Sequence, residues 1–131
     1  MADIRIGKVS KIDYKSGMVK VVYEDRDDAV TDLMPVLTFN AEYKMPQLEE
    51  RVLVVQLSDN DTACVCLGSL WDLDNKPQSQ GKGIYSKEYG EIPAEAYTSY
   101  NSNTGELTIK ADKIIFESAA GRISLADIIN R

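Results

Sequence analysis

Short stretches in which hydrophobic and polar residues alternate, separated by turn signals, dominate the first 75 residues. Strands are expected at Arg5–Ile12 and Met18–Tyr23, because both segments are rich in residues that favour β-structure. Residues 14–17 lie between them and end in Gly17, which supplies the positive φ that a hairpin turn requires. The apolar residues expected on one face of the second strand are Val19, Val21 and Tyr23.

The next segment is less regular. Glu24–Asp32 is expected to be a loop because of its acidic composition, and Leu33–Thr38 is expected to be a strand. Pro35 confines that strand to a sheet edge or a bulge, since proline has no N–H to donate.

Two further strands are predicted at Arg51–Leu57 and Thr62–Leu70, with an antiparallel return through a turn at Ser58–Asp61. In the first, the residues expected to point inward are Leu53, Val55 and Leu57. In the second, the residues expected to share a face are Ala63, Val65 and Leu67. Five such strands in about 75 residues indicate a small closed or nearly closed β-barrel. The spacing alone leaves an OB barrel and an SH3-like barrel both open.

The character of the chain changes after residue 75. Residues 76–83 form a predicted linker between a domain at 1–75 and a second region at 84–131, because this stretch lacks large apolar side chains. The second region contains three short β-rich segments at Leu107–Ala111, Ile114–Glu117 and Arg122–Leu125. A last helical turn capped by Ser124 is an alternative to a fourth strand.

The second region has too few aliphatic residues to form a sufficient core alone. Its apolar residues alternate along the three short segments, so each pair lies on one face. The economical way to bury these faces is against copies of the same chain. The residues predicted to form a trimer interface are Leu107, Ile109, Ile114, Phe116, Ile123 and Leu125.

The charge distribution bears on whether the protein binds nucleic acid. Residues 1–75 contain 8 Lys and Arg against 14 Asp and Glu, a net charge of −6, and residues 76–131 contain 7 of each, a net charge of zero. An acidic first half repels phosphate groups, which argues against nucleic-acid binding.

The chain offers few of the residue patterns that catalyse reactions or bind metal ions. The chain has no histidine, which excludes His-based triads and imidazole metal sites. Cys64 and Cys66 are too few for a zinc site of four cysteines and are expected to be buried, reduced thiols. A calcium loop starting at Asp25 would need Gly and Glu where Val30 and Val36 stand. We therefore expect no enzymatic activity, no catalytic residue, no cofactor and no metal.

The order of segments resembles a known family. Gly7–Ile12, Met45–Val54, Val65–Trp71 and the segment from Tyr97 to Leu125 follow the order seen in the baseplate assembly protein V and central-spike family of contractile phage tails. Trp71 stands where a tyrosine is common, and the similarity covers nearly the whole chain.

This resemblance implies an all-β protein with an N-terminal five-stranded OB-like barrel, followed by a short intertwined trimeric β-helix or β-prism spike. It implies a homotrimer at the baseplate of a phage or of a phage-tail-like particle such as a bacteriocin, assembled in the host cytoplasm. The implied partners are hub and tail-tube proteins, with transient contact to the target cell envelope during puncturing.

The chain also departs from the family. It has no histidine, so it cannot carry the His-x-His iron-binding apex of many members, and no lysozyme domain separates barrel from spike. A separate tip protein or a hub-like role is therefore expected. The alternative from another class is an OB-fold protein that binds single-stranded nucleic acid through Tyr23, Phe39 and Tyr43.

Overall fold

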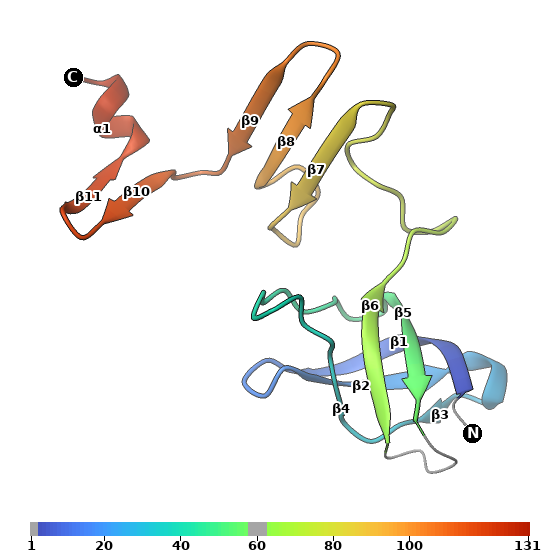
Figure 1. The fold of residues 1–131 in the computed structure, drawn as a ribbon. Helices are drawn as coiled ribbons and strands as arrows, with labels where there is room; N and C mark the ends of the chain where they lie inside the picture. The colour runs from blue at the N-terminus through green and yellow to red at the C-terminus, as the bar shows by residue number, and fades with distance from the viewer. Residues whose placement is uncertain (1–2, 58–62) are drawn as a thin grey trace. The chain divides into compact units, whose positions relative to one another are not determined.

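The computed structural model describes residues 3–57 and 63–131, which form mostly β-structure with one short helix. The prediction of an all-β protein is confirmed at this level. The chain divides into two compact units, Met1–Lys76 and Pro77–Arg131, and each is described separately below (Figure 1).

The N-terminal unit is built around one antiparallel sheet in the order β3-β2-β1-β5-β6, with β4 also paired to β2. Its strands are β1 (Asp3–Asp13), β2 (Met18–Tyr23), β3 (Ala29–Val30), β4 (Met34–Pro35), β5 (Arg51–Gln56) and β6 (Cys64–Ser69). The predicted hairpin of β1 and β2 is confirmed, and Gly17 has φ 73° in its turn. The predicted turn at 58–61 lies outside the described residues.

The segment between β2 and β5 differs from its prediction. The acidic stretch predicted to be a loop contains the 3-10 helix η1 (Glu24–Arg26) and the short strand β3. The strand predicted at Leu33–Thr38 is reduced to the two residues of β4. Pro35 has no N–H to extend the pairing, so the strand ends there.

The sheet of the described residues does not close into a barrel. Beyond β4, the chain approaches β6 through one parallel bridge between Val36 and Cys66. Beside this bridge, the Leu37 N–H donates to the Cys66 carbonyl oxygen at 2.7 Å. Of the predicted closed or nearly closed barrel, the closed form is not observed among the described residues, where β4 and β6 are linked only by this local contact.

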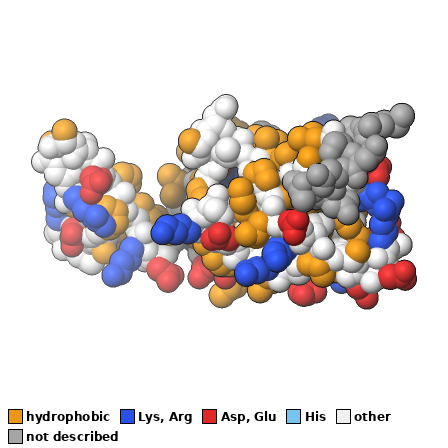
Figure 2. Space-filling view, turned by 90° about the horizontal axis from the view of Figure 1, so that it is seen from below, with side chains coloured by type: hydrophobic (Ala, Val, Ile, Leu, Met, Phe, Trp, Pro, Cys, Tyr) orange, Lys and Arg blue, Asp and Glu red, His pale blue; other side chains and the backbone are white. Residues whose placement is uncertain are grey.

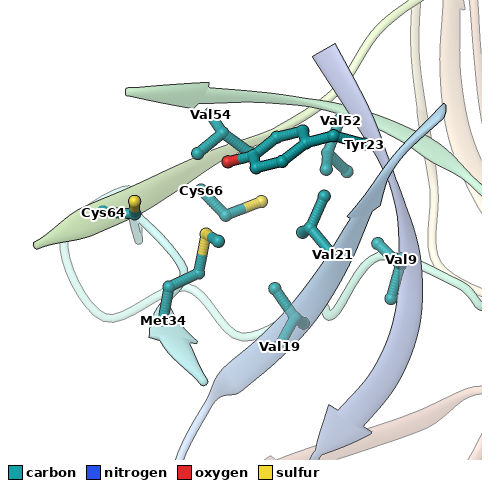
Figure 3. Packing of buried hydrophobic residues seen from close by; sticks show 9 residues of the cluster. All are labelled: Val9, Val19, Val21, Tyr23, Met34, Val52, Val54, Cys64 and Cys66. Carbon is teal, nitrogen blue, oxygen red and sulfur yellow. The ribbon is translucent and has the colours of Figure 1, made fainter. Parts of the chain in front are cut away.

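The core of the N-terminal unit lies on one face of the sheet (Figure 3). The side chains that form it are Val9, Val19, Val21, Tyr23, Met34, Val52, Val54, Cys64 and Cys66. The prediction that the three alternating residues of β2 share one face is confirmed, and this face points into the core. The predicted burial of both cysteines is also confirmed.

The inward face predicted for β5 is wrong. Val52, Val54 and Gln56 are buried in β5, whereas Leu53 and Val55 are half-buried on the other face and Leu57 is 59% exposed. Both faces of this strand carry apolar side chains, so alternation alone could not select between them. Gln56 can point inward because its side-chain oxygen accepts a hydrogen bond from Arg5 Nε at 3.3 Å.

In β6, the residues predicted to share a face are not the ones that face the core. Cys64 and Cys66 are the buried residues, and Val65 and Leu67 are half-buried on the other side of the strand. The predicted antiparallel pairing of β6 with β5 is confirmed.

The C-terminal unit contains a three-stranded antiparallel sheet and a separate β-hairpin. The sheet has the order β7-β8-β9, with bounds β7 (Ile84–Glu88), β8 (Tyr97–Asn101) and β9 (Glu106–Lys110). The hairpin consists of β10 (Ile115–Ser118) and β11 (Gly121–Ser124), followed by the helix α1 (Leu125–Ile129). The three predicted β-rich segments therefore correspond to β9, β10 and β11.

The end of the chain is helical rather than a fourth strand. The Ser124 hydroxyl accepts a hydrogen bond from the Asp127 N–H at 3.2 Å and caps α1. The predicted alternative for this segment, a helical turn capped by Ser124, is therefore confirmed.

Candidate functional site

The C-terminal unit has no buried core of its own. None of its described side chains, residues 77–131, is buried, whereas the N-terminal unit buries nine hydrophobic residues. A two-stranded hairpin is marginally stable in water unless it packs against something else. The apolar faces of this unit are therefore the candidate functional site.

The hairpin brings four of the predicted interface residues onto one face. Phe116 lies directly opposite Ile123, and the Leu125 N–H donates to the Ile114 carbonyl oxygen at 2.8 Å, which sets these two residues opposite each other. Phe116 is 51% exposed, and the other three side chains are half-buried. The predicted apolar face thus exists on the hairpin.

The remaining two predicted interface residues lie on β9. Leu107 is 67% exposed and Ile109 is 54% exposed. In the register of the sheet, Leu107 is opposite Tyr100, which is opposite Tyr85. Tyr85, Tyr100 and Leu107 therefore form one exposed row across the three strands.

Tyr85 and Tyr100 are interface candidates that the sequence did not assign to this face. Their strands, β7 and β8, were not predicted, because serine, lysine and glutamate interrupt the apolar alternation. The signal that could have found them is the concentration of tyrosine and threonine, both of which favour strands.

Charged side chains lie on the opposite faces of the same elements. Lys110 is opposite Tyr97, with its Nζ 5.8 Å from the ring centroid, and it donates to the Ala94 carbonyl oxygen at 2.7 Å. In the hairpin, Arg122 and Glu117 face each other with a 3.4 Å ion pair. The strand β9 and the hairpin thus each carry an apolar pair on one face and charged side chains on the other.

The metal-ligating and thiol side chains of the described residues are not gathered into one site. No group of three or more His, Cys, Asp or Glu in residues 3–57 and 63–131 is arranged to hold a metal ion. Neither cysteine is in a disulfide, and burial raises the pKa of the Cys66 thiol, which disfavours the reactive thiolate.

A group of hydrogen bonds and ion pairs in the N-terminal unit holds the turn at residues 72–75. The Asp72 carboxylate accepts hydrogen bonds from the N–H groups of Asp74 and Asn75, both at 2.9 Å, and these lower its pKa. Arg51 pairs with Asp74 at 2.6 Å and with Asp72 at 3.6 Å. Hydrogen bonding to Asp74 raises the pKa of Arg51.

The three aromatic residues predicted to bind single-stranded nucleic acid in the alternative function differ in their exposure to solvent. Tyr23 is buried in the core at 6% exposure and cannot stack on a base, whereas Phe39 and Tyr43 are 73% and 65% exposed. On the face that Figure 2 presents, hydrophobic side chains lie between acidic and basic ones rather than within a basic groove.

Comparisons with known proteins identify no relative, since no protein-family model and no curated protein matches the chain. Among the described residues, no helix has the length and apolar character needed to cross a membrane.

Proposed function

We propose that the chain is a structural component of the central spike or hub at the baseplate of a contractile phage tail or phage-tail-like particle. In this proposal it works as a homotrimer, binds hub and tube proteins and helps to puncture the target envelope. The observation that carries it is the C-terminal unit with two apolar faces and no buried side chain among residues 77–131.

The pairing order of the N-terminal unit supports an OB-like barrel. Going from strand to strand, β1 pairs with β2, β2 with β4, β6 with β5, and β5 with β1. The bridge from Val36 to Cys66 joins the chain beyond β4 to β6 in parallel. These pairings run from β1 through β2, β4, β6 and β5 back to β1, which is compatible with a five-stranded Greek-key barrel. In this proposal, β4 and β6 pair more extensively in the assembled protein.

A trimeric spike also accounts for the edges of the C-terminal sheets. The strands β7 and β9 are the edges of their sheet, and β10 and β11 each have one unpaired edge within the described residues. Pairing such edges with neighbouring chains would satisfy their backbone groups and remove sites of aggregation. Interlocked chains also unfold slowly, which suits a part exposed to force.

Light scattering on the purified chain tests the oligomeric state. The expected mass is about three times that of one chain at micromolar concentration, because the hydrophobic faces need partners. A clean monomer over this range would contradict the spike proposal.

Binding of single-stranded nucleic acid is the second candidate, favoured by the exposure of Phe39 and Tyr43. It is disfavoured by the charge of −6 on residues 1–75. Cations of this unit are also neutralised locally, since Arg5 pairs with Asp3 at 2.7 Å and Lys8 with Glu24 at 3.2 Å.

A further inference from the structure

The charge of the N-terminal unit is divided between the two ends of β2. Residues 8–20, in the hairpin of β1 and β2, contain four Lys against one Asp, a net charge of +3. Residues 24–32, which follow β2, contain five Asp and Glu against one Arg, a net charge of −4. The net charge of −6 on residues 1–75 therefore includes one basic end and one acidic end.

The basic end contains two like charges that the fold places side by side. Lys11 of β1 lies directly opposite Lys20 of β2, so both side chains lie on the same face of the hairpin. This face points away from the core, because the adjacent pair Ile12 and Val19 packs in the core cluster. Like charges directly opposite each other destabilise a strand pair. The hairpin therefore bears a repulsion that an anionic partner would relieve.

The lysines of this end have no ion-pair partner of their own. Among the described residues, Lys11, Lys15 and Lys20 form no ion pair. Lys15 lies in the hairpin turn and is exposed, as is Lys11. Asp13 accepts a hydrogen bond from the Lys15 N–H at 3.2 Å, so its carboxylate is held against the turn backbone. We call the three lysines the lysine patch, and it can bind a carboxylate group.

The acidic end has exposed carboxylates in a turn of defined shape. Asp25 lies in η1, and Asp27 and Asp28 follow it. All three are exposed, and within the part of the chain that the structure describes none forms an ion pair. Asp27 and Asp28 have φ 55° and 56°, in the left-handed region that Asp tolerates better than most residues. We call residues 24–28 the acidic turn.

The two ends lie too far apart to meet within one chain. The hairpin turn precedes β2 and the acidic turn follows it, so they lie at opposite ends of this strand (Figure 1). The six residues of β2 span about 20 Å. Lys15 and the acidic turn of one chain therefore face different neighbours.

We propose that the lysine patch of one copy binds the acidic turn of the next copy. This inference rests on the proposed trimer. Both halves of the contact, three lysines and three aspartates without ion pairs, are present on every copy. The two surfaces are different, so the contact is heterologous, and such contacts close into a ring when the rotation between copies allows it. In a ring of three, every patch and every acidic turn has a partner.

Charge selects a compact acidic surface rather than a nucleic-acid strand. A single strand needs a positively charged groove that follows its backbone over several nucleotides. The lysine patch is short, and the acidic end of the same unit repels a longer polyanion. Exposed ion pairs are individually weak, so the C-terminal unit holds the copies close together. The contact between patch and turn then fixes how neighbouring N-terminal units are oriented.

Cross-linking of the full-length chain with a carbodiimide tests the inference. The reagent activates a carboxylate, and a lysine in direct contact displaces the activated group to form an amide. Covalent dimers and trimers are expected on a denaturing gel, with cross-linked peptides that join Lys15 or Lys20 to residues 24–28. The variant Lys15→Gln/Lys20→Gln should reduce the cross-linked fraction several-fold. The matched variant Lys82→Gln/Lys113→Gln, at two exposed lysines of the C-terminal unit, should leave it unchanged.

Light scattering on the same samples separates the two proposals. A trimer by mass with the expected cross-linked peptides supports the inference. A trimer whose cross-links persist in Lys15→Gln/Lys20→Gln, or include no peptide from residues 24–28, overturns the inference and leaves the proposed function standing. A monomer by mass overturns both. Binding of an oligo-dT strand that is lost in Lys15→Gln/Lys20→Gln would assign the lysine patch to nucleic acid and also overturn the inference.

Discussion

At Gly7 in β1, the neighbouring strand β2 leaves no room for a side chain. A side-chain Cβ at this position would collide with Val21 Cγ1 and lie 3.0 Å from the Val22 carbonyl oxygen and 3.2 Å from Tyr23 Cδ1. Val21 is fully buried and the Val22 contact is backbone, so neither can move aside easily. The requirement for glycine here comes from crowding against the neighbouring strand.

We expect Gly7→Ala to lower the free energy of unfolding by about 1–3 kcal/mol, which is typical of overpacking. Urea unfolding at fixed protein concentration measures this change. Lys11→Ala, an exposed position on the same strand, should stay within about 0.5 kcal/mol of the wild type. An unchanged urea midpoint for Gly7→Ala would mean that β1 and β2 are less closely packed than described.

Asp72 is expected to make stability depend on pH. Hydrogen bonds from the N–H of Asp74 lower its pKa in the folded state, with further contributions from Asn75 and Arg51. The folded state therefore binds its proton less readily than the unfolded state. The stabilisation is fully present above the unfolded pKa of about 3.9 and is lost as the pH falls through the folded pKa.

The variant Asp72→Asn removes this pH-dependent contribution. Its urea midpoint should lie below that of the wild type at pH 7, and the difference should shrink as the pH is lowered toward 2. Equal differences at both pH values would show that the carboxylate charge does not stabilise this turn.

At the scale of the elements, the clearest prediction concerns the hairpin of β10 and β11. We expect Phe116→Asp to abolish trimer formation, because it removes roughly 2 kcal/mol of apolar burial per chain and places like charges close together. Sedimentation velocity measures the loss. Lys110 is a poor control, since it donates to the Ala94 carbonyl oxygen, so the exposed Lys113→Asp is the better match. A trimeric Phe116→Asp variant with a dissociated Lys113→Asp variant would reverse the assignment of the faces.

The elements also show where sequence patterns suffice. The strands β1, β2, β5 and β6 were predictable because local β-propensity and turn residues agree there. The buried face of β5 could not be predicted from the sequence, because apolar residues lie on both faces of the strand and only tertiary packing determines which face is buried. The apolar pairs of β9 and the hairpin were found from alternation, whereas Tyr85 and Tyr100 required the register of the sheet.

At the scale of the whole molecule, charge and burial divide the chain in the same way. Residues 1–75 combine a net charge of −6 with a buried core, and residues 76–131 combine zero net charge with apolar side chains that are exposed or half-buried. Neutral, uncovered surfaces favour self-association, since no net repulsion opposes it. This division supports a trimer built through the C-terminal unit.

The acidic N-terminal unit yields the last prediction, that the chain does not bind single-stranded DNA. Binding to phosphates requires Lys and Arg to displace counterions, and two arginines of this unit, Arg5 and Arg51, are already paired with carboxylates. Fluorescence anisotropy of a labelled oligo-dT strand should therefore stay unchanged up to millimolar protein at low salt. If Phe39 and Tyr43 stacked on bases, submillimolar binding that weakens steeply with salt would appear, and Phe39→Ala would reduce it. That result would favour the nucleic-acid function over the baseplate role.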